Sequence, residues 1–497
     1  MLRPFVFRFL NEEHALATPL DWDPPRVAKL WRYNLHYFDD LNAQACEQRY
    51  EWHKEWLQRW VEENPPAQGT GWEPYPTSLR IVNWIKWTLA GNELSPECLQ
   101  SLAIQVRWLG CRLETHLLGN HLFANAKALV YAGLFFDGRE AAQWLERGLA
   151  ILAREIPEQI LSDGGQFERS TMYHSLALED MLDLMNMTTA FRQALPQHRV
   201  FAIDGWRSFV VRMTHWAMVM RHPDGEISFF NDAAFGIAPP PNVLSDYALR
   251  LGLSCPDLPS SGVVHLDVSG YIRIQAGPIV ALLDVGPIGP DYLPGHAHAD
   301  TLSFELSLAG QRLFVNSGTS CYGIGGERLR QRGTAAHNTV LVDGEDSSEV
   351  WGGFRVARRA TPSKPTFGRQ PPCYEIATSH DGYTRLPGKN VHRRQWRCDE
   401  QSFIIEDEVT GAFGEAEARF HLHPEVQADT RRLDEGEIIL QLPNGLEAVF
   451  TVTDGQLQVS PSTWHPMFGV SHPNLCVRVK FRSSKIRTVL VWRGEIS

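Results

Sequence analysis

The stretch LGLSCPDLPSSGVV, residues 251–264, divides the sequence into two parts with different periodicity. Before it, apolar residues recur at i, i+3, i+4 and i+7, the spacing of an amphipathic helix. The clearest helical segments are 97–117, 121–136, 139–161 and 175–195. After it, apolar residues alternate or form short β-branched runs between Gly, Pro, Asp and Asn, which is typical of strands. These segments are 263–275, 278–286, 302–318, 338–344, 401–411, 417–426, 476–483 and 486–494.

We therefore predict an α+β fold with two domains, a helical domain over residues 1–255 and an antiparallel β domain over residues 263–497. Helices first and strands afterwards indicate two separately packed parts rather than a βαβ sheet. The length agrees, because a chain of 497 residues exceeds the roughly 250–300 residues at which a single hydrophobic core stops growing.

The composition narrows the class of protein. Hydrophobic residues make up 43% of the chain and charged residues 21%, as in globular proteins and unlike disordered ones. No run approaches the ~20 apolar residues that a membrane span needs. The net charge of -11 disfavours nucleic acid as a partner, and a polyanionic substrate would need a local basic groove.

The start of the chain and its cysteines bear on location. No continuous apolar segment precedes Asn11, so we recognise no signal peptide and expect a cytoplasmic location by default, with a periplasmic or secreted one left open. The eight cysteines include no C-x-x-C pair, which predicts reduced thiols rather than a disulfide scaffold.

Aromatic residues gather near the middle of the helical part. Trp72, Tyr75 and Trp84 lie close together in the sequence, with Arg80 among them. Aromatic rings stack on the apolar faces of sugars, so these four are candidate substrate-binding residues. The alternative is that the rings form the core of a large helical domain.

The segment GNHLFANAKAL, residues 119–129, places Asn120 and His121 at the start of a predicted helix. A polar pair there is well placed to meet an anion, because unpaired backbone N–H groups and the positive end of the helix dipole point outward. The alternative is that Asn120 is only the N-cap.

The segment SDGGQFERSTMYHSLALEDM, residues 162–181, holds a Gly-Gly turn followed by Gln166, Glu168 and Tyr173. We expect it to cross a cleft as a loop before an amphipathic helix, with Gln166 and Glu168 as substrate-binding candidates. A tyrosine can donate and accept a proton if its neighbours lower its pKa from about 10. The alternative is that Tyr173 is structural.

The segment GHAHADTLSFEL, residues 295–306, is predicted to lead into a strand, so His296 and His298 would point to one face. Both imidazoles could then bind one metal, or one could bind a metal and the other a substrate. Asn316 and His337 are the further ligand candidates. Asp300 could take part only if the strand twists.

Basic residues cluster at Arg328, Arg330 and Arg332. Arginines on a surface are mostly solvated, but this cluster could form the local groove that the net charge does not supply. Arg330 is our candidate for substrate contact.

In their order and spacing these clusters resemble the heparinase II/III-like polysaccharide lyases, a superfamily that also contains oligoalginate lyases. The resemblance covers most of the chain. It implies an incomplete (α/α) toroid followed by an antiparallel β-sandwich. The opening LWRYNLHYFDDL and the segment SLRIVNWIKW are similar to short members found with bacterial surface-polysaccharide genes.

The resemblance implies a lyase that cuts a uronic-acid polymer by β-elimination. Asn120 and His121 match the positions that hold the uronate carboxylate, Tyr173 matches the tyrosine that moves protons, and His296 matches its partner base or acid. The C5 proton is too weakly acidic to leave unless the carboxylate charge is neutralised, which explains the hydrogen-bond donors. Syn and anti elimination both stay open.

The resemblance also implies a structural zinc ion. His298 and His337 match two of its ligands, but Asn316 stands where an Asp is usual. A neutral amide oxygen is a poorer partner for a divalent cation than a carboxylate, so occupancy by zinc is left open.

The leading hypothesis is therefore a lyase acting on an anionic polysaccharide or oligosaccharide. The first alternative is a non-catalytic glycan-binding protein of a polysaccharide assembly system. The second is a metal-dependent hydrolase centred on His296, His298 and His337. The sequence does not distinguish glycosaminoglycan, alginate and exopolysaccharide substrates, nor endo from exo action, and it gives no oligomeric state.

Overall fold

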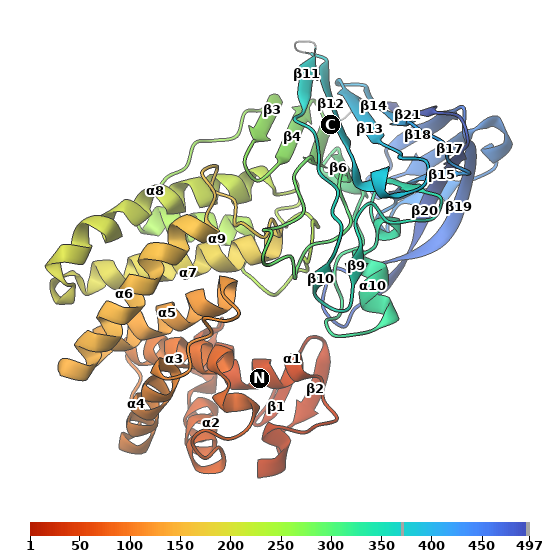
Figure 1. Ribbon diagram of the computed structural model, residues 1–497. Coiled ribbons are helices and arrows are strands. Elements are labelled where there is room, and N and C mark those ends of the chain that lie inside the picture. The colour runs from red at the N-terminus through yellow and green to blue at the C-terminus, as the bar shows by residue number, and fades with distance from the viewer. Residues whose placement is uncertain (369–371, 494–497) are drawn as a thin grey trace. The chain divides into compact units, whose positions relative to one another are not determined.

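The structure is a computed structural model that describes residues 1–368 and 372–493 (Figure 1). The chain forms two compact units. The first holds Met1–Gln159 and Asp180–Ser208, and the second holds Ile160–Glu179 and Phe209–Ser497, of which residues 494–497 are not described. The predicted domain ranges, 1–255 and 263–497, divide the chain elsewhere and stay a prediction.

Helices dominate the N-terminal part, after a short hairpin of β1 (Val6–Phe9) and β2 (Glu12–Ala15). The α-helices are α1 (Lys29–Tyr37), α2 (Tyr50–Glu63), α3 (Pro74–Leu89), α4 (Pro96–Gly110), α5 (Gly119–Phe135), α6 (Arg139–Gln159), α7 (Thr171–Ala190), α8 (Gln197–Val219), α9 (Pro241–Arg250) and α10 (Gly326–Arg332). The helices predicted at 97–117, 121–136, 139–161 and 175–195 are confirmed as α4 to α7. No helix in the described ranges combines the length and apolarity that crossing a membrane requires.

Helix α5 carries two predicted site residues and is held by close packing against α6. A Cβ atom at Gly133 of α5 would lie 2.5 Å from the backbone nitrogen of Leu145, and one at Gly148 of α6 would lie 2.8 Å from the carbonyl oxygen of Ala126. Larger residues would push the two helices apart. The two glycines therefore help to fix the position of α5, and with it the start of that helix.

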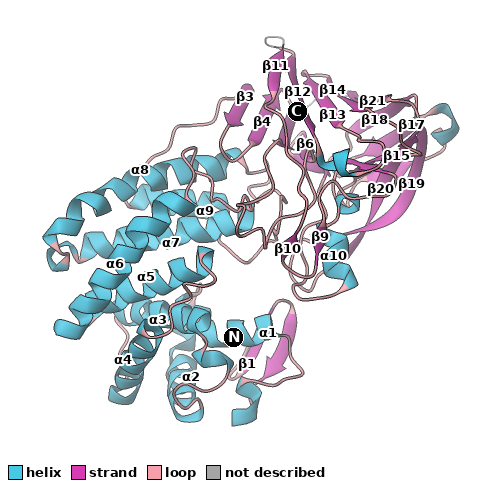
Figure 2. Ribbon diagram, viewed as in Figure 1, coloured by secondary structure: helices cyan, strands magenta, loops and turns pink. Residues whose placement is uncertain are grey.

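Strands dominate the C-terminal part, shown in magenta in Figure 2. They are β3 (Gly262–Leu266), β4 (Tyr271–Ala276), β5 (Ile279–Asp284), β6 (Phe304–Leu308), β7 (Gln311–Phe314), β8 (Val340–Val342), β9 (Val350–Trp351), β10 (Arg355–Val356), β11 (Thr366–Gly368), β12 (Tyr374–His380), β13 (His392–Cys398), β14 (Ser402–Val409), β15 (Ala416–His421), β16 (Gln427–Asp429), β17 (Glu437–Gln441), β18 (Glu447–Thr453), β19 (Gln456–Trp464), β20 (His472–Phe481) and β21 (Lys485–Arg493).

These strands form three larger antiparallel sheets and the β9–β10 hairpin. The strand orders are β3-β4-β5-β6-β7, β19-β20-β15-β8 and β11-β12-β13-β14-β21-β18-β17-β16. The α+β fold class, with helices followed by antiparallel sheets, is confirmed. The predicted strand at 486–494 is β21, although its last residue, Gly494, lies outside the described residues.

One apolar core joins the three larger sheets of the second unit. It includes Ile272 of β4, Phe304 of β6, Trp396 of β13, Phe420 of β15 and Phe450 of β18, all almost completely buried. Burial of these aromatic and branched side chains stabilises the packing of the sheets on one another.

The predicted strand at His296 and His298 is wrong, because β6 begins only at Phe304 and both histidines lie in the loop before it. The backbone of this loop pairs with other loops instead of a neighbouring strand. The carbonyl of His296 accepts the N–H of Asp232 at 3.0 Å, and the N–H of His298 donates to the side-chain oxygen of Asn231 at 3.0 Å. Both rings nevertheless turn toward one residue, Asp232.

A buried polar chain crosses the largest sheet. Arg394 donates to both oxygens of Asp407, at 2.7 and 3.0 Å, and Nε2 of His392 donates to the same carboxylate at 2.8 Å. Nδ1 of His392 lies 3.2 Å from Nε2 of His380. Burial would raise the pKa of Asp407, but Arg394 and His392 hold it at about 2. Burial lowers the pKa of both histidines.

We expect the melting temperature to fall as the pH falls below about 6.5, partly because of His380. The ring of His380 is neutral in the fold but takes up a proton in the unfolded chain. Its contribution to stability is therefore fully present above the pKa of the unfolded chain and decreases as the pH falls toward the lower pKa of the folded state. One such ring accounts for up to about 1.4 kcal/mol per pH unit. Thermal unfolding between about pH 8 and about pH 5 measures this, and H380Q should show a smaller decrease. An equal decrease in H380Q would contradict the assignment.

Candidate active site

His296 presents a partly accessible imidazole, with 15% of its side chain exposed. Its Nδ1 lies 2.9 Å from Oδ2 of Asp232. An ionised carboxylate only accepts hydrogen bonds, so Nδ1 carries a proton and donates it. The other ring nitrogen, Nε2, lies 3.8 Å from Oε2 of Glu168. The ring is thus oriented with Nε2 away from Asp232.

Asp232 is completely buried and uses both of its carboxylate oxygens. Oδ1 accepts Nε2–H of His298 at 2.9 Å, and the guanidinium of Arg328 donates to both oxygens, with Nη2 2.7 Å from Oδ2. Burial alone would raise the pKa of Asp232, but Arg328 and the hydrogen bonds from His296 and His298 hold it well below its usual range. Asp232 is therefore ionised at neutral pH.

Tyr173 packs against His296 with 3.9 Å between ring centroids and 32° between the ring planes. Helix α7 begins at Thr171, so Tyr173 lies in its first turn and not in the preceding loop as expected; Ser170 Oγ accepts its N–H at 3.1 Å. Burial, and then the proximity of Tyr322 and Asp232, raise the pKa of Tyr173 well above its usual value. Its hydroxyl is therefore protonated at neutral pH.

Tyr322 is a second phenol at this place, with its hydroxyl 3.0 Å from that of Tyr173. Arg328 lies over its ring, 5.0 Å from Cζ to centroid, and Phe354 packs against both Tyr322 and His296. Asp232 and Tyr322 are not among the site residues predicted from the sequence. Neither has a periodic or motif signal, because each is a single residue in a loop.

Gln166 and Glu168 are buried beside this group. Glu168 donates its N–H to Oε1 of Gln166 at 2.9 Å, and Nε2 of Gln166 donates to Oε1 of Glu168 at 3.2 Å. This exchange fixes the Glu168 carboxylate whose other oxygen faces His296. The structure therefore brings four predicted site residues of the second unit together: Gln166, Glu168, Tyr173 and His296.

His298 and His337 form a buried pair with Nδ1 of His298 3.2 Å from Nε2 of His337. Burial lowers the pKa of His298 to about 4, so its ring is neutral at neutral pH. Because Nε2–H of His298 donates to Asp232, Nδ1 of His298 can only accept the hydrogen bond from Nε2–H of His337. A metal ion bound here would have to displace that proton.

The third predicted ligand, Asn316, has its side chain bound to the backbone. Oδ1 accepts the N–H of Asn338 at 3.1 Å, and Nδ2 donates to the carbonyl of Phe229 at 2.9 Å. Across residues 1–368 and 372–493, no group of three or more His, Cys, Asp and Glu side chains could hold a metal ion. These contacts do not fit the zinc site that the resemblance implies, and the ligand set stays a prediction.

Asn120 and His121 lie in the first turn of α5, in the first unit, and both are partly exposed. The helix is preceded by Leu118, so Asn120 is not its N-cap. Nδ1 of His121 donates to the buried carboxylate of Glu114 at 3.0 Å, and its ring packs on Tyr75 with 4.5 Å between centroids. Glu114 also accepts a hydrogen bond from Asn125 at 3.0 Å.

Burial raises the pKa of Tyr75, an effect that a hydrogen bond from Asn120 partly offsets. Tyr75, Asn120 and His121 therefore form one partly exposed polar group in the first unit. The amide of Asn120 can donate to a carboxylate, and Nε2 of His121 can do so when the ring is protonated.

Trp72, Arg80 and Trp84 need a correction, because all three are buried in the first unit. Arg80 and Trp84 have no exposed surface. Arg80 donates to Oε1 of Gln105 at 2.9 Å and to the carbonyl of Gly71 at 2.8 Å. None of the three offers a surface to a glycan, since each packs into the helical core. Arg330, in contrast, is exposed and paired with Glu327.

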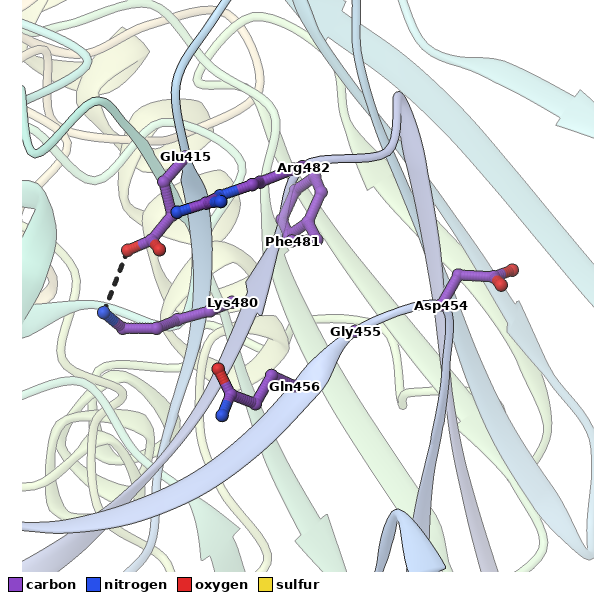
Figure 3. A pocket seen from close by; sticks show the side chains of 7 residues that line it. All are labelled: Glu415, Asp454, Gly455, Gln456, Lys480, Phe481 and Arg482. Atoms are coloured by element: carbon purple, nitrogen blue, oxygen red, sulfur yellow. Dashed lines mark hydrogen bonds and ion pairs between the residues drawn. The ribbon is translucent and has the colours of Figure 1, made fainter. Parts of the chain in front are cut away.

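A surface hollow in the second unit lies between the ends of β19 and β20, lined by Glu415, Asp454, Gly455, Gln456, Lys480, Phe481 and Arg482 (Figure 3). Lys480 donates to Glu415 at 2.9 Å. The hollow has no imidazole or phenol in its lining, so we do not regard it as an acid–base site.

Helices followed by antiparallel sheets define an α+β protein. A histidine, a tyrosine and a buried carboxylate grouped in the second unit make a candidate acid–base site. Two family descriptions match the chain: "Heparinase II/III N-terminus" over residues 9–239 and "Heparinase II/III-like, C-terminal" over residues 259–493. The chain therefore belongs to the heparinase II/III-like superfamily.

Individual relatives agree with this assignment. The chain is 26% identical over 374 residues to a heparin-sulfate lyase of Bacteroides stercoris, covering 69% of this chain and 52% of the relative. It is 23% identical over 444 residues to a heparin-sulfate lyase of Bacteroides thetaiotaomicron, covering 79% and 61%. The crystal structure of heparinase III superposes with a TM-score of 0.77 at 19% identity, covering 95% of this chain and 79% of that one. The chain thus spans little more than half the length of the curated relatives.

Proposed function

We propose that the protein is a polysaccharide lyase that cleaves a uronate-containing glycosaminoglycan, or a related anionic polysaccharide, by β-elimination. The observation that carries the proposal is His296, which is partly exposed, bound through Nδ1 to buried Asp232 and packed against the ring of Tyr173. The names of the relatives, heparin-sulfate lyases, support a glycosaminoglycan as substrate.

In the proposed reaction His296 removes the C5 proton through Nε2. The electron pair of the C5–H bond forms the C4=C5 double bond as the C4–O4 bond breaks, and Tyr173 gives its proton to O4. A tyrosine with a raised pKa is suited to the acid role rather than to the base role. The Glu168 carboxylate, 3.8 Å from Nε2, favours the imidazolium that forms. The hydroxyl of Tyr322, 3.0 Å from that of Tyr173, can donate a hydrogen bond to the phenolate that this step leaves on Tyr173.

Asn120 and His121 stay the predicted donors for the uronate carboxylate. Removal of the C5 proton places negative charge on that carboxylate, and fixed donors lower the barrier by neutralising it. The hydrogen bond from Nδ1 of His121 to Glu114 fixes the orientation of the ring. Nε2 then donates to the uronate carboxylate in the imidazolium form, in which both ring nitrogens carry a proton.

The test is ultraviolet absorbance over time with the purified protein and a panel of heparan sulfate, heparin, chondroitin sulfate, hyaluronan and alginate. Elimination creates a double bond conjugated to the carboxylate, which hydrolysis does not. A rising signal with one or more polymers supports the proposal and identifies the substrate. A flat signal with all five, together with measurable binding, would instead support a glycan-binding protein.

Metal removal is expected to leave the rate of elimination and the melting temperature unchanged. The reason is that the atoms that would bind the metal already have hydrogen-bond partners. The Asn316 side-chain amide is hydrogen-bonded to the backbone, and Nδ1 of His298 is hydrogen-bonded to Nε2 of His337. Elemental analysis of the purified protein, and the absorbance assay before and after a chelator, measure this. One equivalent of zinc that H298A abolishes would contradict it.

A further inference from the structure

Asp232 joins both histidines of the segment GHAHAD to Arg328. We propose that Asp232 is a positioning residue. Its carboxylate holds His296 with the proton on Nδ1 and the lone pair on Nε2, while His298 and Arg328 keep the carboxylate ionised and fixed. The importance of this arrangement for catalysis rests on the proposed function, but the proton position does not.

The geometry around Oδ2 determines which nitrogen of His296 is protonated. Oδ2 lies 2.9 Å from Nδ1 of His296 and 2.7 Å from Nη2 of Arg328. Arg328 is charged, only 1% exposed, and has Asp232 as its ion-pair partner. A carboxylate in this pair has no proton to donate, so His296 has to be the donor. Nε2 is then the basic nitrogen of the ring.

Several contacts prevent the carboxylate from rotating. Oδ1 accepts from Arg328, from Nε2 of His298 at 2.9 Å and from Oγ1 of Thr319 at 3.3 Å. The N–H of Asp232 also donates to the carbonyl of His296 at 3.0 Å. The second histidine of the segment therefore acts on the first through Asp232, and no metal ion is needed for that effect.

The variant D232N tests this role. Oδ1 has three donors and Oδ2 has two, so the amide oxygen is expected at the Oδ1 position and the NH₂ group opposite His296. His296 then has to accept at Nδ1, which moves its proton to Nε2 and removes the base. We expect kcat to fall about 10²–10⁴-fold with KM nearly unchanged. A kcat within about threefold of the wild type would overturn the proposal.

The chain offers a matched control in Asp407. Like Asp232, it is a buried carboxylate that accepts from an arginine, Arg394, and a histidine, His392. It has no contact with His296. D407N should lower the melting temperature as D232N does, but leave kcat of the folded protein unchanged. If D407N lowered kcat as much as D232N, loss of stability would explain both and the positioning role would be wrong.

In D232N the buried charge of Arg328 loses its carboxylate partner, which destabilises the fold. The double variant D232N/R328M therefore removes both charges of the pair. It should fold and still show the low kcat. A wild-type kcat in this variant would overturn the proposal.

The ring ¹⁵N chemical shifts of His296, assigned by comparison with H296Q, report the proton position without any substrate. The wild type should show Nδ1–H, D232N should show Nε2–H, and D407N should match the wild type. Nε2–H in the wild type would overturn the proposal. If the wild type shows Nδ1–H but cleaves no polymer, only the proposed function fails.

Discussion

Replacing Tyr173 by phenylalanine is expected to lower kcat for elimination by about 10²–10⁴-fold, while the folded protein still binds its glycan. Phenylalanine keeps the ring that packs against His296, with 3.9 Å between centroids, and removes only the hydroxyl. That hydroxyl is the proton donor for O4 in the proposed reaction, and no other phenol contacts the His296 ring as closely among the described residues. The absorbance assay measures kcat, and calorimetry with the same polymer measures binding.

Tyr374 is the matched control, because its hydroxyl also lies close to another hydroxyl, that of Ser261 at 3.1 Å, in the same unit. Y374F should keep the wild-type kcat. The double variant Y173F/H296Q should be little slower than the slower single variant, since residues that act in one step are not additive. Y173F with wild-type kcat would remove Tyr173 from the mechanism and leave His296 without its proposed acid.

The arrangement of elements was largely predictable, because it follows from periodicity. The helices α4 to α7 coincide with segments whose apolar residues recur about every 3.6 residues. The strands β3 to β7 coincide with segments in which apolar residues alternate with a period of about 2 residues. The loop at His296 and His298 was not predictable in this way. Its i, i+2 spacing resembles a strand, but its hydrogen bonds go to Asn231 and Asp232.

The candidate site was predictable only in part, for a related reason. The family resemblance led to Tyr173 and His296, whose roles are still untested. Asp232 is 64 residues from His296 and 96 from Arg328 in the sequence. Contacts between segments so far apart leave no periodic signal, and a single Asp in an apolar segment resembles many others. The hydrogen bonds that Asp232 accepts from His296, His298 and Arg328 become apparent only in the folded structure.

The prediction for Arg80 fails in the opposite way. The local sequence pattern suggested a substrate-binding residue, but the structure places Arg80 in the buried core. An arginine between tryptophans is consistent with a sugar-binding surface and equally with a buried cation. The structure places Cζ of Arg80 3.9 Å from the ring centroid of Trp60, with no exposed surface. The sequence could not decide between the two, because burial depends on how α1, α3 and α4 pack.

R80M is therefore expected to lower the free energy of unfolding by about 3 kcal/mol, with kcat and KM of the folded protein unchanged. Methionine has a similar length but no donors, so the carbonyl of His36 and the amide oxygen of Gln105 lose Arg80 as a donor. The carbonyl of Gly71 also loses Arg80 but keeps the hydrogen bond from Thr77. A buried acceptor without a partner costs about 1–3 kcal/mol. Release of the buried charge offsets part of that cost.

R330M is the control, because Arg330 is exposed and its ion pair with Glu327 lies on the surface. Its stability should stay within about 0.5 kcal/mol of the wild type, and KM should rise if Arg330 contacts the glycan. Chemical denaturation and the absorbance assay measure both properties in both variants. A rise in KM for R80M at unchanged stability would mean that Arg80 reaches the substrate after all, and the first unit would then have to open its core around Trp60 to allow it.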